Sequence, residues 1–200
     1  MKIYRYVIDH DMGFSPNPFY GVCTLANCKP VIRRVAKTGD FILGFGSANS
    51  AVSGKLIYWM LVEETTNFDH YWKDPRFQRK KPVVNGSLIK FYGDNIYHRD
   101  DHGAIVQEWS FHSLPDGRPN PRNIKRDTGS TSRILVGSDF GYYGRAAITV
   151  PEEISPVIAR GRGHRTKLRG CSPEDVAHWL LHSTERGFCG EPLGWSRISA

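Results

Sequence analysis

The sequence has no long apolar stretch. Its longest hydrophobic run lies around Leu56–Val62, whereas a membrane-spanning helix needs about 18–20 consecutive apolar residues. The first residues, MKIYRYVIDHD, carry charges in a strand-like pattern, which does not fit a signal peptide. We therefore expect a cytoplasmic protein without a membrane partner.

Cysteine is also scarce. The chain of 200 residues contains 4 cysteines, Cys23, Cys28, Cys171 and Cys189. This number does not suggest a disulfide framework, and the short paired spacings of structural zinc sites are missing. His178 and His182 lie one helical turn apart and could chelate zinc together with the two C-terminal cysteines. The spacing favours surface histidines and packed cysteines instead, so we expect neither a metal nor a cofactor.

The two common nucleotide-binding fingerprints are absent. The segment GFGSANSAVSGK (44–55) is rich in glycine and serine and follows a predicted strand, yet it matches neither GxxxxGK[ST] nor GxGxxG. It therefore predicts no P-loop or dinucleotide fold. A generic anion-binding loop and a plain connection between strands both remain compatible with it.

Length and composition fit one globular domain over residues 1–200, since 40% of the residues are hydrophobic. Strand-like patterns cover residues 2–8, 40–45, 55–64, 87–92, 104–111, 133–137 and 145–150. Helices gather at the two ends of the chain, which predicts an α+β fold with a curved or barrel-like mixed sheet. The polar stretch 113–132 is predicted to be a flexible loop.

The two helices carry clear boundary signals. Residues 28–37 predict an amphipathic helix capped by Asn27, with Arg33 and Arg34 partly toward solvent. Near the C-terminus, Ser172 and Asp175 form a capping box around Pro173 and begin a longer helix. Gly187 is expected to end that helix.

Positive charge is concentrated in one region. The formal net charge is +7, and residues 118–169 hold eleven Lys or Arg against four Asp or Glu. Such a distribution attracts a polyanion by releasing its counterions. It favours a nucleic-acid partner, DNA more than RNA, or a nucleotide; a solvated basic face is the alternative.

Cys28 is a candidate nucleophile. The start of a helix and the neighbouring Lys29, Arg33 and Arg34 favour its thiolate, and a base such as His10 or His98 would have to approach it. Cysteine is also among the most buried residue types, so a packed structural role is the alternative. The free N–H groups of the same helix start, together with these cations, would suit a phosphate.

Aromatic and polar residues occur together along the chain, as an extruded base requires. The set comprises Tyr20, Trp59, Trp72, Phe91, Tyr92, Tyr97, Tyr142 and Tyr143, interleaved with Asp40, Asp94, Asp139 and Arg145. In the segment SDFGYYGRAA several of them fall in a tight turn at a strand start. We expect a base pocket near this turn, although core packing would also explain the rings.

Three long stretches carry a family resemblance. They are SPNPFYGVCTLANCKPVIRRVAKTGDFILGFGS (15–47), SDFGYYGRAAITVPEEI (138–154) and the tail GRGHRT…WLLHSTERGFCGEP (161–192). Together they resemble the nucleotide modification associated domain family, second type, over nearly the whole chain. The resemblance implies a component of phage or bacterial systems that make, read or counter modified DNA bases.

A more distant likeness concerns the segments GDFILGFGS, GKLIYWMLVEET and DPRFQRKKP, which are similar to PUA-like barrels of the EVE and ASCH type. Those barrels hold a base in an aromatic cage. The resemblance implies that the pocket residues are Asp40, Ser47, Trp59, Tyr92 and Tyr142. Tyr143 is a further stacking candidate, and Lys29, Arg33, Arg34 and Arg145 are the expected phosphate contacts.

Three functional hypotheses follow. The first is a protein that recognises a modified base in DNA, with or without processing it, within a phage-defence or modification system. The second is a hydrolase or group transferase acting on a free nucleotide or DNA base, with Asp40 or Asp94 as general base and Cys28 as nucleophile. The third is a protein-interaction module of a defence complex.

Overall fold

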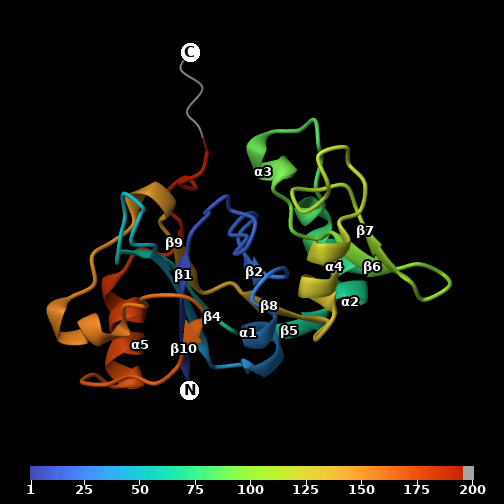
Figure 1. Ribbon diagram of the computed structural model, residues 1–200. Coiled ribbons are helices and arrows are strands. Elements are labelled where there is room, and N and C mark those ends of the chain that lie inside the picture. Colours follow the sequence, from blue (N-terminus) through green and yellow to red (C-terminus); the bar gives the residue numbers. More distant parts are fainter. Residues whose placement is uncertain (196–200) are drawn as a thin grey trace, which may run out of the picture. The chain divides into compact units, whose positions relative to one another are not determined.

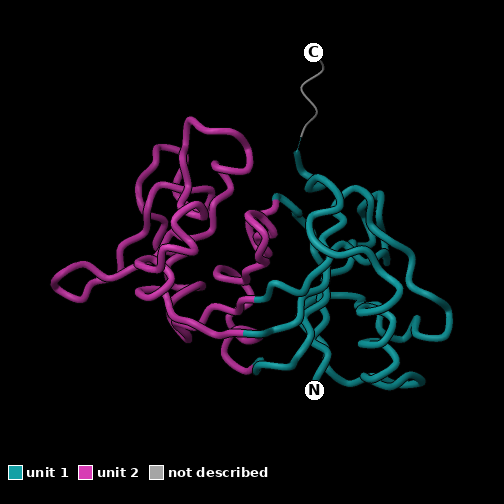
Figure 2. Tube along the Cα trace, turned by 180° about the vertical axis from the view of Figure 1, so that it is seen from behind, with its two compact units in different colours: residues 1–12, 36–63, 137–200 teal, residues 13–35, 64–136 magenta. Residues whose placement is uncertain are grey.

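The computed structural model describes residues 1–195, which divide into two compact units (Figure 2). Unit 1 comprises Met1–Met12, Ala36–Glu63 and the chain from Gly137 onward. Unit 2 comprises Gly13–Val35 and Glu64–Val136. Each unit draws on separate stretches of the chain, and the two are described in turn. No helix among the described residues is long and apolar enough to cross a membrane.

Unit 1 is built on a six-stranded sheet (Figure 1). Its order is β10 (His164–Arg165), β1 (Ile3–Ile8), β3 (Phe41–Gly46), β4 (Leu56–Leu61), β9 (Phe140–Tyr142) and β11 (Gly187–Phe188). β1 runs parallel to β3, while β4 is antiparallel to both of its neighbours. The prediction of a mixed α+β fold is confirmed. Within residues 1–195 the strands do not close into a barrel.

The core of unit 1 is apolar. Apart from Gly44 and Gly46, β3 and β4 consist of β-branched, aromatic and other large apolar residues, which suit strands buried on both faces. One face is covered by α5 (Pro173–Ser183), whose Val176, Ala177 and Leu180 belong to the same buried cluster as Leu43 and Trp59. The predicted capping box is present at the start of α5.

One predicted strand of unit 1 is wrong. Residues 145–150 form no strand: the 3₁₀ helix η2 (Gly144–Ala146) is followed by a single bridge from Ile148 to Leu56 and then by η3 (Glu152–Val157). Gly144 has a φ of +50°, and a Cβ at this position would clash with the Glu191 carbonyl. A close backbone approach therefore bends the chain here instead of extending it.

Unit 2 contains smaller sheets and short helices. One sheet has the order β2 (Cys23–Leu25), β8 (Arg133–Gly137) and β5 (Glu64–Asn67). A hairpin pairs β6 (Tyr97–Arg99) with β7 (Ile105–Gln107). The helices are α1 (Pro30–Val35), α2 (Phe68–Lys73), η1 (Pro75–Lys80), α3 (Leu88–Phe91) and α4 (Pro121–Thr128).

Two predictions for unit 2 are wrong. Residues 87–92 contain the helix α3 instead of a strand, and the expected flexible loop 113–132 contains the helix α4. The side chain of Asn120 accepts hydrogen bonds from the first turn of α4, and Pro121 occupies its first position. The buried residue of this helix is Asp127, so a carboxylate and not an apolar stripe anchors it.

The turn before α1 also differs from the prediction. The helix is shorter than the expected 28–37. Asn27 does not cap it: its side-chain oxygen accepts no hydrogen bond from the described residues, and its amide donates to the Asp94 carbonyl at 2.9 Å. Cys28 and Lys29 have φ values of +55° and +38°. Residues other than glycine rarely adopt φ values in this region, so the backbone makes a strained turn at Cys28.

Candidate active site

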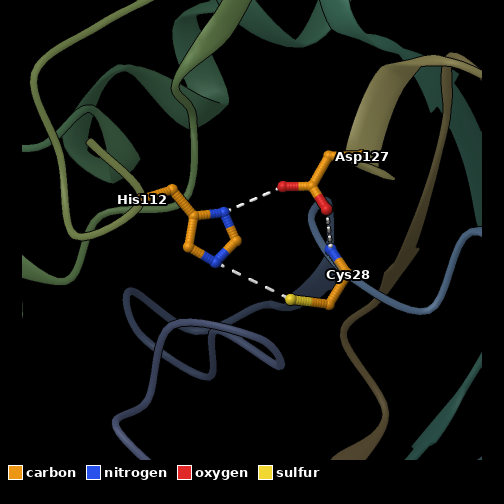
Figure 3. A group of neighbouring side chains, drawn as sticks. All are labelled: Cys28, His112 and Asp127. Carbon is orange, nitrogen blue, oxygen red and sulfur yellow. Dashed lines mark hydrogen bonds and ion pairs between the residues drawn. The ribbon is translucent and has the colours of Figure 1, made fainter. Parts of the chain in front are cut away.

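Three side chains that are distant in sequence meet in unit 2 (Figure 3). Cys28 precedes α1, His112 lies after β7, and Asp127 comes from α4. The Cys28 Sγ lies 3.7 Å from Nε2 of His112, and the opposite ring nitrogen, Nδ1, lies 2.8 Å from Oδ2 of Asp127. The backbone N–H of Cys28 donates to Oδ1 of Asp127 at 2.9 Å. The three residues therefore form a closed set: thiol, imidazole, carboxylate.

Asp127 is buried but fully hydrogen-bonded. Its side chain is 0% exposed. Besides His112 and Cys28, it accepts from Nε of Arg126 at 2.8 Å and from the Tyr97 hydroxyl at 3.1 Å. Burial alone would raise the pKa of Asp127, but the hydrogen bonds from His112 and Arg126 hold it well below its ordinary value. The carboxylate is therefore ionised at neutral pH.

His112 is held in a fixed orientation. The Phe14 ring lies 4.4 Å from its imidazole, centroid to centroid, and the Asn123 amide donates to its carbonyl at 2.7 Å. Burial lowers the pKa of His112, yet its hydrogen bonds to Asp127 and Cys28 outweigh burial and raise the pKa above the ordinary value. The imidazole is thus suited to take and keep a proton from a neighbouring thiol.

Arg33 supports the turn that carries Cys28. Its guanidinium is buried and donates to the carbonyls of Cys28 at 3.0 Å, Ala26 at 2.5 Å and Arg133 at 3.0 Å. It also donates to the backbone carbonyl of Asp127. A positive φ at a residue other than glycine costs on the order of 1–3 kcal/mol, and such strain persists only where surrounding contacts fix it. Arg33 supplies these contacts on both sides of the turn.

The same three residues are the group of potential metal ligands found among residues 1–195, with one ligand atom from each within 4.8 Å of the others. The hydrogen bonds do not suit a cation. Both oxygens of Asp127 already accept several donors, and Nδ1 of His112 faces the carboxylate. Nη2 of Arg126 lies 3.2 Å from each ring nitrogen of His112, which adds a fixed positive charge. The arrangement fits a nucleophile with an oriented base.

Of the predicted catalytic residues, Cys28 is the one that lies beside a histidine. The histidine is His112, whereas the sequence had suggested His10 or His98. His98 Nε2 pairs with Glu108 at 2.8 Å, and His98 stacks on Trp72. His10 belongs to unit 1. Sequence reasoning missed His112 and Asp127 because both fall at or inside the stretch that was predicted to be flexible.

Asp94 lies in a second buried network of unit 2. It is 1% exposed and accepts from the hydroxyls of Thr24 and Tyr71, both at 2.7 Å. Burial raises the pKa of Asp94 to about 6, despite the opposing charge of Lys80. Lys80 is itself buried, and its ammonium donates to Asn17 and to the Val22 carbonyl. The hydrogen bonds of Asp94 thus hold this network together, and its role as a general base stays a prediction.

The predicted contacts to base and phosphate in unit 2 lie in different settings. Tyr92 is close to the candidate site, since its ring lies 5.1 Å from that of Phe111. Lys29 is half-buried at the strained turn, and Arg34 is exposed on α1. Arg33, as described, is buried against carbonyl groups and presents no exposed surface to a phosphate.

Trp59 and Tyr143 belong to the core of unit 1. Trp59 is 0% exposed, and its indole N–H is shared between the hydroxyls of Tyr143 and Thr184, both at 3.0 Å. Tyr142 is also buried, and its hydroxyl donates to Asp11. These rings therefore offer no open face to a base in this conformation.

The remaining predicted residues of unit 1 make local contacts. Asp40 accepts from the backbone N–H of Lys2 at 2.8 Å and of Lys37 at 2.9 Å, which fixes a turn. Ser47 is half-buried in the loop after β3. Arg145 donates to the Pro192 carbonyl at 3.3 Å. The two hydrogen bonds to Asp40 give it a structural role, and its predicted catalytic role stays a prediction.

The C-terminal histidines lie on α5. The rings of His178 and His182 stack with centroids 4.4 Å apart, and both residues are exposed. The Cys189 thiol donates to the carbonyls of Arg186 and Gly187, each at 3.5 Å. In residues 1–195 these side chains do not combine with Cys171 into a group suited to a metal.

Fold and site together define an α+β protein with a cysteine–histidine–aspartate cluster. The chain belongs to the family described as nucleotide modification associated domain 2, whose sequence model matches residues 1–199. The family resemblance seen in the sequence is thereby confirmed. No curated protein and no solved structure matches the chain. The likeness to PUA-like barrels therefore stays a prediction.

Proposed function

We propose that this chain is an enzyme that uses Cys28 as a nucleophile in hydrolysis or group transfer on a nucleotide or on a base of DNA. The observation that carries the proposal is the placement of His112 between two partners, with Nε2 at the thiol and Nδ1 at the buried Asp127 carboxylate. A histidine that is oriented by a buried carboxylate is the common arrangement for activating a cysteine or serine.

In the proposed reaction, His112 takes the proton of the Cys28 thiol. The resulting imidazolium is stabilised by the Asp127 carboxylate, and the thiolate attacks an electrophilic carbon of the substrate. His112 then returns the proton to the leaving group, which departs as a covalent thiol adduct forms. Water or a second acceptor, deprotonated by His112, releases the product from Cys28.

The nucleotide part of the proposal rests on the family and on charge. The family description associates the domain with nucleotide modification, and a net charge of +7 favours an anionic partner. Recognition of a base without turnover and a pure interaction module were the other hypotheses. An enzyme is favoured over both, because neither needs a histidine and a buried carboxylate aligned on a half-buried thiol.

The proposal is tested by the reactivity of Cys28 toward iodoacetamide, followed by peptide mass spectrometry from about pH 5 to 9, the range in which thiols ionise. Cys171 and Cys189 are half-buried as well and serve as internal references. We expect Cys28 to react faster than both references.

The matched variants are His112→Asn and His182→Asn. The first removes the base at the thiol, and the second removes an exposed histidine of α5. We expect Cys28 to react at the rate of the reference cysteines in His112→Asn and to be unchanged in His182→Asn. If wild-type Cys28 reacts no faster than Cys171 and Cys189, the proposed nucleophile is wrong.

A further inference from the structure

Two large aromatic side chains close to His112 in sequence are exposed. Trp109 is 54% and Phe111 is 41% exposed. Gly117 packs closely against one of them: it has a φ of +85°, and a Cβ there would lie 3.0 Å from the Trp109 indole. Large aromatic rings that stay exposed to water are a common property of binding surfaces.

Phe111 is part of a ring cluster that includes the imidazole of the candidate site. Its centroid lies 6.1 Å from that of His112, at 28° between the ring planes. Phe14 lies 5.5 Å from Phe111 and Tyr92 lies 5.1 Å from it, both nearly perpendicular. Phe14 and Tyr92 are buried and orient Phe111, whereas Phe111 itself reaches solvent.

A guanidinium also contacts the imidazole of His112. Arg126 places Nη2 at 3.2 Å from both ring nitrogens of His112 and donates Nε to Asp127. Its side chain is nevertheless 41% exposed. Arg126 therefore presents a permanent positive charge at the same imidazole that borders Phe111.

We propose that Phe111 and Arg126 form a nucleotide subsite beside Cys28, with the base stacked on Phe111 and a phosphate on the Arg126 guanidinium. The inference rests on the proposed function and names its substrate class. A planar ring joined to an anion matches an exposed aromatic ring next to an exposed cation. An acidic peptide would need the cation but not the exposed ring.

The test is equilibrium binding of a nucleoside, its 5′-monophosphate and inorganic phosphate to the full chain carrying Cys28→Ala, which prevents turnover. In this background, Phe111→Ala is expected to weaken the nucleoside and the monophosphate by about tenfold, which corresponds to one base–aromatic stack, and to leave inorganic phosphate unchanged. Arg126→Gln is expected to reduce the affinity for the monophosphate to that for the nucleoside.

The chain offers matched controls. Phe188 is 43% exposed and belongs to unit 1, so Phe188→Ala removes an equally exposed ring elsewhere. The Arg118 side chain is 76% exposed and pairs with Asp116, so Arg118→Gln removes an equal charge. Because Arg126 also pairs with Asp127, Arg126→Lys is measured beside Arg126→Gln. A lysine should retain most of the phosphate contribution.

A protection experiment on the wild-type chain tests whether the nucleotide binds beside Cys28. A saturating monophosphate should slow the alkylation of Cys28 but not of Cys171 or Cys189. The subsite is overturned if Phe111→Ala behaves like Phe188→Ala for every ligand, if no monophosphate binds at millimolar concentration, or if a bound one leaves Cys28 unprotected. A slow Cys28 thiol in the absence of ligand would instead overturn the proposed nucleophile, whatever the binding measurements give.

Discussion

The two compact units differ in what they bury. Among the described residues, eleven of the buried polar or charged side chains belong to unit 2 and three belong to unit 1. Unit 1 buries mainly the apolar residues of a six-stranded sheet. A buried polar group destabilises a fold unless hydrogen bonds compensate it, so unit 2 depends on specific partners much more than unit 1 does.

The buried groups of unit 2 form two sets. One contains the Cys28–His112–Asp127 cluster together with Arg33 and Tyr97, and the other contains Lys80 and Asp94 with their hydrogen-bond partners. Such sets are retained where charges must be positioned. Under the proposed function, unit 2 carries the chemistry and unit 1 supplies an apolar core. Variants in both units test this division.

The largest effect is expected for Asp127→Asn. It removes the charge that faces Arg126 and His112 in a fully buried position, and breaking such a pair costs about 3–5 kcal/mol. We expect this loss in the free energy of unfolding, measured with urea, together with loss of the fast Cys28 alkylation. Asp40→Asn in unit 1, where the carboxylate meets backbone N–H groups, is the comparison. Equal losses for the two variants would contradict the division.

The second prediction concerns pH. Burial raises the pKa of Asp94 to about 6, above its ordinary value in an unfolded chain, so the folded protein binds this proton more tightly. The stabilising contribution of protonated Asp94 is complete below about pH 4 and is lost as the pH rises through about 6. We expect wild type to lose stability relative to Asp94→Asn over this interval. A constant difference from pH 4 to 7 would contradict the proposed protonation.

The sequence predicts the regular parts of the molecule well. The continuous apolar runs in β3 and β4 and the capping box of α5 determine local structure by themselves, and all three were found where the pattern placed them. α4 was missed because it lacks an apolar stripe and is anchored by Asp127. The Asn120–Pro121 pair was its available signal, since both residues favour a helix start.

The candidate site was predictable only in part. Cys28 was proposed from its charged neighbours, whereas its partners depend on contacts between positions 84 and 99 residues away in the sequence. Many histidines and aspartates are available in such a chain, and only the tertiary fold selects among them. The positive φ of Cys28 could not be predicted either, because a glycine is the usual sequence signal for such a backbone conformation and none occurs at this position.

A third prediction separates core aromatic residues from binding ones. Trp59→Phe in unit 1 removes an indole N–H that bonds to two hydroxyls, which should cost about 1–2 kcal/mol of unfolding free energy. Because Trp59 is fully buried, the affinity for a nucleoside monophosphate should not change. A large loss of affinity at unchanged stability would instead restore the pocket that the sequence predicted around Trp59.

The smallest effects come from helix caps, and they give the sharpest comparison of the two units. Ser172→Ala opens the capping box of α5, and Asn120→Ala removes the side chain that accepts from the first turn of α4. Each should cost about 1 kcal/mol of unfolding free energy.

α4 also carries Asp127, so fraying its first turn should loosen the carboxylate behind His112. We therefore expect Asn120→Ala to slow Cys28 alkylation severalfold and Ser172→Ala to leave it unchanged. If both variants lose stability equally and neither changes the thiol, the first turn of α4 does not control the base, and the side-chain hydrogen bonds of Asp127 are sufficient to hold it.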